Sequence, residues 1–488
     1  MPVGSPFKNT VKIALVIFGA CMIFLLVKKV HLVPDLSEVT GAELKDSETW
    51  MSIYLKKQKI GYSVQSITRL EQGYIADSKA YLKLKLMGQV REIRTITSAR
   101  LSKSMGLESF NFFLSSGPVR FQLTGVLSGH VMNMTMMTGG YKTSSQIRLN
   151  EVPRLTIGLM PYLAQQGLKK NQRYRVSIFD PSSLSSRWIN IVVEGKEKIV
   201  IEGETYDTFR VRMDYFDTQS YAWIDVNGRT IKEDGLLGLS MIRSTPEEAK
   251  KGLSGRAELT DVVKATSVPA DRVLKNPRKI KYLKVRLNGV NLKGFDLNGG
   301  RQVLSGNVVE IRKETIDVRH ETSLPLTDAR FEPFLKSTSL VQARNPDIIH
   351  QARLITSGEK SPLNIVDKMV GWTFENLQKR PTMSVPSAVD VLKTKVGDCN
   401  EHAVLTTALL RAAGVPARMV AGVLYFENRF YYHAWVEVYW GRWMAVDPIL
   451  DQVPADASHI RFLTGGLDRQ AEMVRVIGRL KINILDFK

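Results

Sequence analysis

One cysteine stands where a helix would activate it as a nucleophile. Asp398, Cys399 and Glu401 directly precede an apolar stripe of helical period. Asp398 has the side chain of an N-cap, and Glu401 follows it by three residues, which is the spacing of a capping box. We therefore expect Cys399 at the first helical position, where exposed N–H groups and the positive end of the helix dipole favour a thiolate. Glu401 is then a capping residue and not an acid in the chemistry.

A nucleophilic thiolate also needs a base and a group that orients the base, and a hairpin after the helix offers both. Alternation along the first strand of this hairpin places His433 on one face. Residues 439–441 have the length and the glycine position of a three-residue hairpin loop. The register that this loop sets places Val438 opposite Arg442 and His433 opposite Asp447. Directly opposed residues have Cβ atoms about 4.5–5.5 Å apart, so we expect an imidazole–carboxylate hydrogen bond.

Three other residues near this set carry weaker signals. Trp435 and Glu437 share the strand face of His433, and we expect them to line the substrate cleft. Cys399, His402 and His433 could instead bind a metal ion. Because the chain has a single thiol after its N-terminal apolar run and no second spaced ligand pair, we predict no metal and no cofactor. His402 is then a surface or supporting residue of the helix.

The length and the charge of the chain limit its class. A chain of 488 residues is too long for one core of usual size, so we expect two or three domains. The formal net charge of +20 favours contact with anionic surfaces but does not say which kind. The basic residues are spread along the chain and we find no nucleic-acid-binding motif. We therefore predict no nucleic-acid partner and interpret the charge as a solvated basic surface.

An uncharged apolar run at residues 13–27 lies between lysines near the N-terminus. A membrane span needs about 20 residues, and neighbouring apolar residues with snorkelling lysines would extend this run to 13–33. No small-residue cleavage site follows, so we predict an uncleaved signal anchor rather than a removed signal peptide. The predicted chain is single-pass, with its bulk in the extracytoplasmic space. Cys21 lies within the run, so we expect no intrachain disulfide outside it.

The remaining sequence divides by its hydrophobic period. Alternation at residues 81–86, and an Asn227-Gly228 pair between two strand-like runs, predict an antiparallel β-rich region. A helical stripe appears only later, at Val366, Met369 and Val370. The predicted domains are a cytoplasmic tail at 1–12, an anchor at 13–33, a β-rich domain of unassigned family at 48–266, a linker at 267–280, a small β module at 281–344 and a catalytic domain at 345–488.

The motifs around the predicted site resemble those of the transglutaminase-like superfamily, in its bacterial branch. The matching segments are Gly397-Asp398-Cys399 with Glu401 and Ala403, LRAAGVPAR at 410–418, HAWVEV at 433–438, and Trp443 with Asp447-Pro448. The resemblance covers roughly residues 345–462. It implies a papain-like α+β fold in which Cys399 is the nucleophile, His433 the general base and acid, and Asp447 the residue that orients His433. The bacterial inner membrane and the periplasm, as the location of the chain, are implied only by this resemblance.

The resemblance also bears on the reaction. Animal transglutaminases place Trp after the cysteine, where this chain has Asn400, and many bacterial relatives look like peptidases or amide hydrolases. His459 resembles a position of bacterial relatives, and we expect it to pack against the site in a structural role. We name the backbone N–H of Cys399 as one oxyanion donor and leave the second unassigned.

The expected architecture is a multidomain α+β chain with an N-terminal transmembrane anchor, an antiparallel β-rich domain and a C-terminal papain-like domain. The expected function is that of a membrane-anchored, extracytoplasmic cysteine hydrolase or acyltransferase, such as a peptidase or amidase. It would act on a protein or peptide through a thioester at Cys399. The alternative is a non-catalytic envelope assembly or binding protein, in which the β-rich domain engages a partner and the C-terminal domain is a scaffold.

Overall fold

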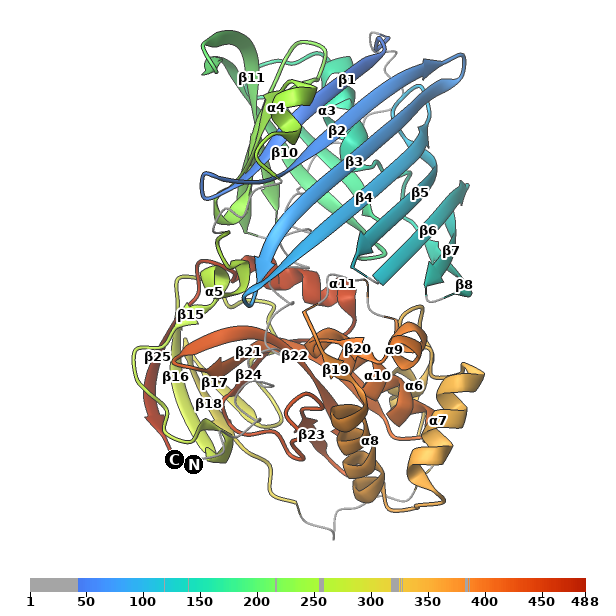
Figure 1. The fold of residues 1–488 in the computed structure, drawn as a ribbon, viewed down its shortest axis with the longest axis vertical. Coiled ribbons are helices and arrows are strands. Elements are labelled where there is room, and N and C mark those ends of the chain that lie inside the picture. The colour runs from blue at the N-terminus through green and yellow to red at the C-terminus, as the bar shows by residue number, and fades with distance from the viewer. Residues whose placement is uncertain are drawn as a thin grey trace.

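The structure is a computed structural model, and it describes residues 43–488 except 118, 139, 216, 254–258, 317–323, 325, 327, 382–384 and 386. Figure 1 shows two lobes, a large curved sheet from the first half of the chain and a mixed lobe from the second half. The predicted tail and anchor at 1–33 lie outside the described residues. Among the helices that the structure describes, none has both the length and the apolar character that a membrane span requires.

The first lobe, here called the β-rich lobe, is one antiparallel 14-stranded sheet with a helix on its inner side. The strand order is β8-β7-β6-β5-β4-β3-β2-β1-β14-β13-β12-β11-β10-β9. The helix is α3 (Thr156–Gln165). The strands are β1 (Ser47–Leu55), β2 (Gln58–Leu70), β3 (Gly73–Leu86), β4 (Gln89–Leu101), β5 (Leu107–Ser116), β6 (Val119–Ser128), β7 (Val131–Thr138), β8 (Tyr141–Arg148), β9 (Arg173–Asp180), β10 (Ser185–Ile201), β11 (Glu204–Tyr215), β12 (Thr218–Ile224), β13 (Thr230–Asp234) and β14 (Leu239–Ser244).

Side-chain alternation explains why these residues form a sheet with one wet face. Leu82, Leu84 and Leu86 of β3 are buried, and the lysines between them are partly exposed, as the sequence predicts. The hairpin predicted at Asn227-Gly228 is also present, since β12 pairs with β13. Its loop is longer than a two-residue turn, and Gly228 has a positive φ of 79° whereas Asn227 does not.

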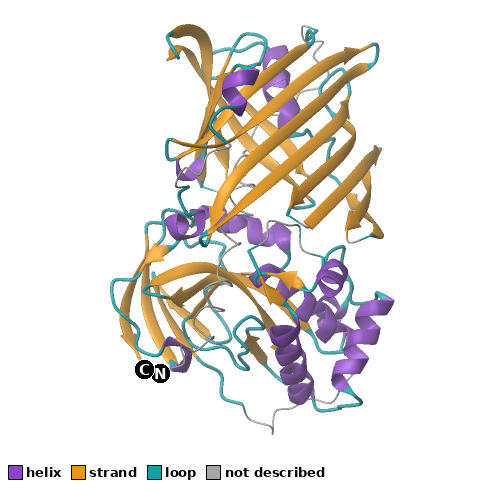
Figure 2. Cartoon of the chain, in the orientation of Figure 1, coloured by secondary structure: helices purple, strands orange, loops and turns teal. Residues whose placement is uncertain are grey.

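The second lobe, here called the C-terminal lobe, combines two antiparallel sheets with a group of helices, and Figure 2 shows that most helix lies in this lobe. One sheet has the order β15-β22-β21-β24 with β23 beside β22, and the other has the order β17-β18-β16-β25. The strands are β15 (Val268–Pro269), β16 (Tyr282–Asn288), β17 (Gln302–Ser305), β18 (Val308–Arg312), β21 (Ala417–Phe426), β22 (Arg429–Tyr439), β23 (Trp443–Val446), β24 (His459–Thr464) and β25 (Lys481–Phe487). A parallel pair joins β19 (Gln378–Lys379) to β20 (Val396–Gly397).

A central helix carries the predicted nucleophile. This helix, α10 (Cys399–Ala412), packs against β21 and β22 on one side and against helices on the other, and its first three turns are buried. The predicted stripe of Val366, Met369 and Val370 is confirmed as the buried face of α8. The packing helices are α7 (Pro346–Thr356), α8 (Pro362–Asn376) and α9 (Ala388–Thr394). Short helices are α4 (Pro246–Lys250), α5 (Val262–Thr266), α6 (Glu332–Leu335), α11 (Leu467–Gln470), η1 (Leu236–Gly238), η2 (Pro277–Lys279), η4 (Ala329–Phe331) and η5 (Ala471–Arg475).

The segments predicted as a linker and as a small β module are built into the C-terminal lobe. Within 267–280, β15 pairs with β22, and Leu274 and Ile280 are buried in the core. Within 281–344, strands β16, β17 and β18 form the predicted small sheet, but the last strand of the chain, β25, completes it. This four-stranded sheet is therefore complete only when β25 pairs with β16.

The β-rich lobe touches the C-terminal lobe close to the start of α10. Arg91 of β4 donates from Nε to the carbonyl oxygen of Pro381 at 3.0 Å. The next residue back, Arg380, donates its N–H to the carbonyl of Gly397, two residues before Cys399. Tyr141 of β8 also bonds through its hydroxyl to the Asp347 carboxylate at the start of α7. The two lobes are thus joined beside the segment that leads into the predicted nucleophile.

Candidate active site

The capping residues set Cys399 at the first position of α10. The Asp398 side chain accepts from the N–H of Asn400 at 3.0 Å, and the Glu401 carboxylate accepts from the N–H of Asp398 at 3.0 Å. The predicted capping box is therefore confirmed. Cys399 is a free cysteine and only 1% exposed. Because the first turn of a helix leaves its N–H groups without partners inside the helix, the backbone N–H of Cys399 suits the predicted oxyanion donor.

The charge state of Cys399 differs from the thiolate that its helix position predicts. Burial raises the pKa of the thiol well above its ordinary value, and the Asp398 and Glu401 carboxylates act in the same direction. A hydrogen bond from the backbone N–H of Ala434 to the sulfur opposes them. The carboxylates that cap the helix thus offset its positive end, and the resting group is a neutral thiol.

His433 and Asp447 are in direct contact, although the register that led to this prediction is wrong by two residues. The hairpin of β22 and β23 pairs Val438 with Met444 and not with Arg442. Nε2 of His433 still lies 2.8 Å from Oδ2 of Asp447. A shift of two residues keeps every side chain on its face, and diagonal neighbours about 7–8 Å apart remain within reach of long side chains.

The turn after β23 holds the Asp447 carboxylate in place. Oδ1 of Asp447 accepts from the N–H groups of Ile449 at 2.9 Å and Leu450 at 3.3 Å. Burial acts to raise the pKa of Asp447, but the charges and hydrogen bonds of His433 and His459 outweigh it and hold this pKa well below its usual range. Asp447 is therefore ionised, and it fixes His433 as the tautomer with a proton on Nε2.

The other nitrogen of His433 is ready to accept a proton. Nδ1 is buried and has no hydrogen-bond partner among the described residues. Burial lowers the pKa of His433, and the opposing effect of Asp447 is smaller, so the imidazole is neutral at pH 7. The neighbouring residue, Ala434, contacts the Cys399 sulfur through its N–H. The site therefore combines a thiol, a neutral imidazole and an orienting carboxylate.

His459 belongs to the same hydrogen-bonded group, which sequence reasoning assigned only to packing. Its Nε2 lies 2.9 Å from the same Asp447 oxygen that His433 contacts. His433, Asp447 and His459 offer three ligand atoms within 4.8 Å of one another, a set that could hold a metal ion. These atoms already bond to one another, so a metal would have to replace both hydrogen bonds. The predicted alternative set with Cys399 and His402 is not among the metal-ligand groups of the described residues.

Trp435 covers the two histidines and does not line a cleft. Its side chain is fully buried. The indole stacks on the His433 ring with centroids 5.9 Å apart and meets the His459 ring edge-on at 5.3 Å. The structure thus gives no support to the predicted contact of Trp435 with substrate, and the ring instead keeps water away from the imidazoles.

Glu437 is likewise buried and serves as an anion between two arginines. Its Oε2 accepts from Arg418 Nε and Nη2 at 2.9 and 2.6 Å, and its Oε1 accepts from Arg461 Nη1 at 2.6 Å. These bonds tie β22 to β21 and β24. The predicted role of Glu437 in substrate binding therefore lacks support in this structure.

We predict that Glu437→Ala destabilises the fold by about 3–5 kcal/mol, because it leaves the buried guanidinium of Arg461 without its counter-charge. Urea unfolding monitored by tryptophan fluorescence measures this loss. Glu375→Ala, at an exposed position of α8, is the matched control and is expected to stay within about 0.5 kcal/mol of wild type. An equally small change for Glu437→Ala would contradict the assigned role.

His402 lies in the core, which excludes the surface position and leaves the supporting role on the helix that the sequence also suggests. Its side chain is fully buried, and Nδ1 lies 2.6 Å from the Asp398 carbonyl oxygen. Burial lowers the pKa of His402 to about 3. The folded protein therefore binds fewer protons at His402 than the unfolded chain between pH 6.5 and about 3.

This difference predicts a loss of stability in acid. As the pH falls from about 6 to 4.5, His402 is expected to remove about 1.4 kcal/mol of folding free energy per pH unit. His402→Leu should reduce the pH slope by that amount, measured by urea unfolding at several pH values. His350→Leu, at an exposed position of α7, should leave the slope unchanged, and equal slopes in all three proteins would refute the buried neutral state.

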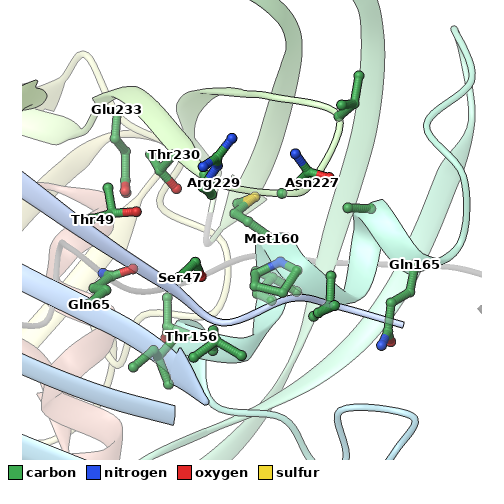
Figure 3. A pocket seen from close by; sticks show the side chains of 18 of the residues that line it. Ser47, Thr49, Gln65, Thr156, Met160, Gln165, Asn227, Arg229, Thr230 and Glu233 are labelled. Atoms are coloured by element: carbon green, nitrogen blue, oxygen red, sulfur yellow. The ribbon is translucent and has the colours of Figure 1, made fainter. Parts of the chain in front are cut away.

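The β-rich lobe contains a separate cavity of about 360 Å³. Figure 3 shows polar side chains of β1, β2 and the β12–β13 loop facing residues of α3 across it. The lining includes Thr49, Gln65, Met160, Arg229 and Glu233, and Arg229 is paired with Asp225 at 2.7 Å. The described residues that line this cavity all belong to the β-rich lobe. It is therefore distinct from the candidate active site.

Comparison with known proteins adds relatives for parts of the chain. An uncharacterized protein of Mycobacterium leprae is 28% identical over 205 residues, which span 38% of this chain and 72% of that relative. A candidate cysteine protease from Cytophaga hutchinsonii covers 43% of this chain and 86% of its own, at 19% identity and a TM-score of 0.30. A candidate protease from Parabacteroides distasonis covers 81% of this chain and 68% of its own, at 11% identity and a TM-score of 0.22.

A family model covers the part of the C-terminal lobe that holds the candidate site. Residues 349–448 match the model described as the transglutaminase-like superfamily. This span contains Cys399, His433 and Asp447, whereas His459 lies beyond it. The resemblance expected from the sequence motifs is thereby confirmed, and residues 349–448 of this chain form a domain of the transglutaminase-like superfamily.

Proposed function

We propose that this chain is a cysteine hydrolase or acyltransferase that cleaves or transfers an amide acyl group through a thioester at Cys399. One observation carries the proposal. His433 donates from Nε2 to Asp447 at 2.8 Å, while its Nδ1 has no partner among the described residues. The residue that follows His433 contacts the Cys399 sulfur through its backbone N–H. An oriented base next to a thiol is the arrangement that activates a cysteine as a nucleophile.

The proposed reaction passes through two acyl-transfer steps. The Cys399 proton moves to Nδ1 of His433 as the sulfur attacks the amide carbonyl, and the carbonyl oxygen takes the negative charge. The carbon–nitrogen bond then breaks, and His433 returns the proton to the leaving amine. Water or a second amine gives a proton to His433 and attacks the thioester. The carbon–sulfur bond breaks, the acid or new amide leaves, and the thiol regains its proton.

The rate of alkylation at Cys399 tests this proposal without a known substrate. Full-length protein is treated with iodoacetamide at pH 7, and mass spectrometry quantifies the modified Cys399 peptide over time. A general base contributes typically 10²–10⁴-fold, so His433→Ala is expected to slow alkylation by about 10²-fold or more. His350→Ala is the control on an exposed histidine. Equal alkylation rates for wild type and His433→Ala would show that His433 does not activate the Cys399 thiol, which would contradict the proposal.

Access to Cys399 is part of the same proposal. Cys399, His433 and Asp447 are at most 1% exposed in this structure. Substrate entry therefore requires movement, and the contact of Arg91 with Pro381 joins the lobes close to the cysteine. We infer that docking of the β-rich lobe limits access.

We predict that Arg91→Ala speeds alkylation of Cys399 by about 10-fold or more, because a hydrogen bond from a charged group contributes about 1.5–3 kcal/mol and about 1.4 kcal/mol corresponds to a factor of ten. The same mass-spectrometric rate measures the effect. Arg94→Ala is the matched control on β4, since the Arg94 side chain is largely exposed and pairs with Glu92. If both variants alkylate at the wild-type rate, docking of the lobes does not limit access.

We also propose that the protein is held at a bacterial inner membrane through residues 13–33, with its β-rich lobe engaging a protein or peptide substrate or an envelope partner. The apolar run and the basic net charge support the location. The size and the separate cavity of the β-rich lobe support a binding role. Fractionation of cells that express the chain with and without residues 13–33 tests the anchor, which predicts membrane recovery of the longer form alone. Proteins that co-purify with wild type but not after removal of residues 47–244 test the binding role.

A further inference from the structure

A second buried histidine shares the orienting carboxylate with His433. His459 is the first residue of β24, and its Nε2 lies 2.9 Å from Asp447 Oδ2, the oxygen that His433 Nε2 contacts at 2.8 Å. Nδ1 of His459 lies 3.1 Å from the carbonyl oxygen of Asp456 and 3.4 Å from Oδ1 of the Asp456 carboxylate. All four side chains are fully buried. His459 therefore connects two aspartates inside the core.

The partners of His459 determine its charge. A neutral imidazole has one nitrogen that donates a hydrogen bond and one that accepts. Neither neighbour of His459 has a proton to give, because Asp447 is ionised and the contact at Asp456 is a carbonyl oxygen. Both ring nitrogens must then donate, which requires the imidazolium form. Burial acts to lower the pKa of His459, but the two aspartates outweigh it and raise that pKa above its ordinary value.

His433 has the opposite set of neighbours. One of its nitrogens donates to Asp447, and the other has no partner among the described residues. Its own pKa is lowered, because burial exceeds the effect of Asp447, and the positive charge of His459 lowers it further. Two histidines on one carboxylate oxygen thus hold different numbers of protons.

Fixed charges around the pair support this division. Asp456 Oδ2 lies 2.9 Å from Nη1 of Arg278, and the Asp456 carbonyl accepts from Arg301 Nη2 at 2.9 Å. Arg301 in turn lies 3.6 Å from the Glu314 carboxylate. The charged groups that act on the two histidines include Asp447, Asp456 and Arg278. Arg301 bonds to the Asp456 carbonyl. His402 of α10 is influenced by His433, and Lys379 of β19 acts on both His402 and Asp447. The positive charge of His459, which adds to that of Arg278, is therefore balanced by Asp447 and Asp456.

We propose that His459 is a positively charged positioning residue that shares Asp447 with His433 and thereby keeps His433 neutral and able to accept the Cys399 proton. The inference rests on the proposed function, because it assigns His433 as the base. The positive charge on His459 opposes the effect of the Asp447 carboxylate, which acts to raise the pKa of His433. Without this charge, the pKa of His433 would be higher, and a smaller fraction of His433 would be neutral and able to accept the thiol proton at a given pH.

Nitrogen NMR of the full-length protein, labelled at its histidine nitrogens, tests the charge directly. At pH 7, both ring nitrogens of His459 are expected to carry protons, and Nδ1 of His433 is expected to carry none. The signals are assigned by their loss in His459→Gln and His433→Gln. An unprotonated ring nitrogen on His459 at pH 7 would overturn the proposal, whatever the activity of the protein.

The pH dependence of Cys399 alkylation tests the consequence. In His459→Gln, the amide can still donate to Asp447 but carries no charge. The limb of the rate profile that reports His433 is expected to move to higher pH by about one unit. His350→Gln should leave it in place, and a lower rate at every pH without such a movement would mean a structural role only.

A second variant keeps the test decisive if His459→Gln does not fold. Asp456→Asn replaces the negatively charged carboxylate beside Nδ1 of His459 with a neutral amide. It is expected to lower the pH at which His459 loses its second ring proton, as measured by the same NMR titration. An unchanged titration would contradict the proposed charge. Alkylation that does not depend on His433 would refute the proposed function alone, because the NMR result stands without it.

Discussion

Cells that carry Cys399→Ala are expected to lose processing of the natural substrate by a factor of about 10⁴ or more, because the variant removes the nucleophile while the rest of the site remains. Proteome-wide comparison of substrate fragments and crosslinks between wild type and Cys399→Ala measures the loss. New amine-linked products would indicate acyl transfer, and new carboxyl termini would indicate hydrolysis. The same comparison therefore identifies the substrate and the acceptor.

The control for this experiment is the other cysteine of the chain. Cys21→Ala removes a thiol that is not among the proposed site residues, and it is expected to leave the fragment pattern unchanged. Both variants must accumulate to the wild-type level, since loss of protein would imitate loss of activity. A Cys399→Ala strain that processes normally would favour the non-catalytic alternative, in which the transglutaminase-like domain is a scaffold.

Asp447→Asn is expected to lower the rate by about 10⁴-fold, because the amide no longer holds a proton on Nε2 of His433. With the amide donating to Nε2, the proton sits on Nδ1, and the imidazole cannot accept the proton of Cys399. The loss appears both in substrate processing and in the alkylation rate of Cys399 at pH 7. The backbone bonds that Oδ1 of Asp447 accepts from Ile449 and Leu450 are kept by the isosteric amide.

Asp451→Asn provides the comparison for Asp447→Asn. Asp451 lies in the same turn but is exposed, so its substitution should change the alkylation rate little. Far-UV circular dichroism and urea unfolding would show whether each variant keeps its fold. If Asp447→Asn alkylates and processes substrate like wild type, Asp447 does not orient the base, and the proposed roles of His433 and His459 lose their foundation.

Local patterns in the sequence determined where the nucleophile stands. The capping box of Asp398 and Glu401 sets the start of α10, because both bonds form between residues at most three positions apart. The burial of Val366, Met369 and Val370 likewise follows from the period of a helix. Such features need no knowledge of the rest of the fold, since the partners are close in sequence.

The pair of His433 and Asp447 shows how far a local pattern extends. The predicted register was wrong by two residues, because the sequence does not decide where a three-residue loop begins. The contact is present all the same, since strand side chains repeat with a period of two. The sequence therefore predicts the sheet face on which a side chain lies better than it predicts which residues stand opposite each other on paired strands.

Tertiary structure alone decided the charge and the accessibility of the site. Full burial of Cys399 and His433 reverses the expected preference for a thiolate, and burial depends on packing between segments far apart in the chain. The contact of His459 with Asp447 arises because β24 adds to β21, a pairing that no local motif predicts. The sequence by itself thus determined the nucleophile, its cap and the face of its base, whereas long-range packing determined which groups carry protons.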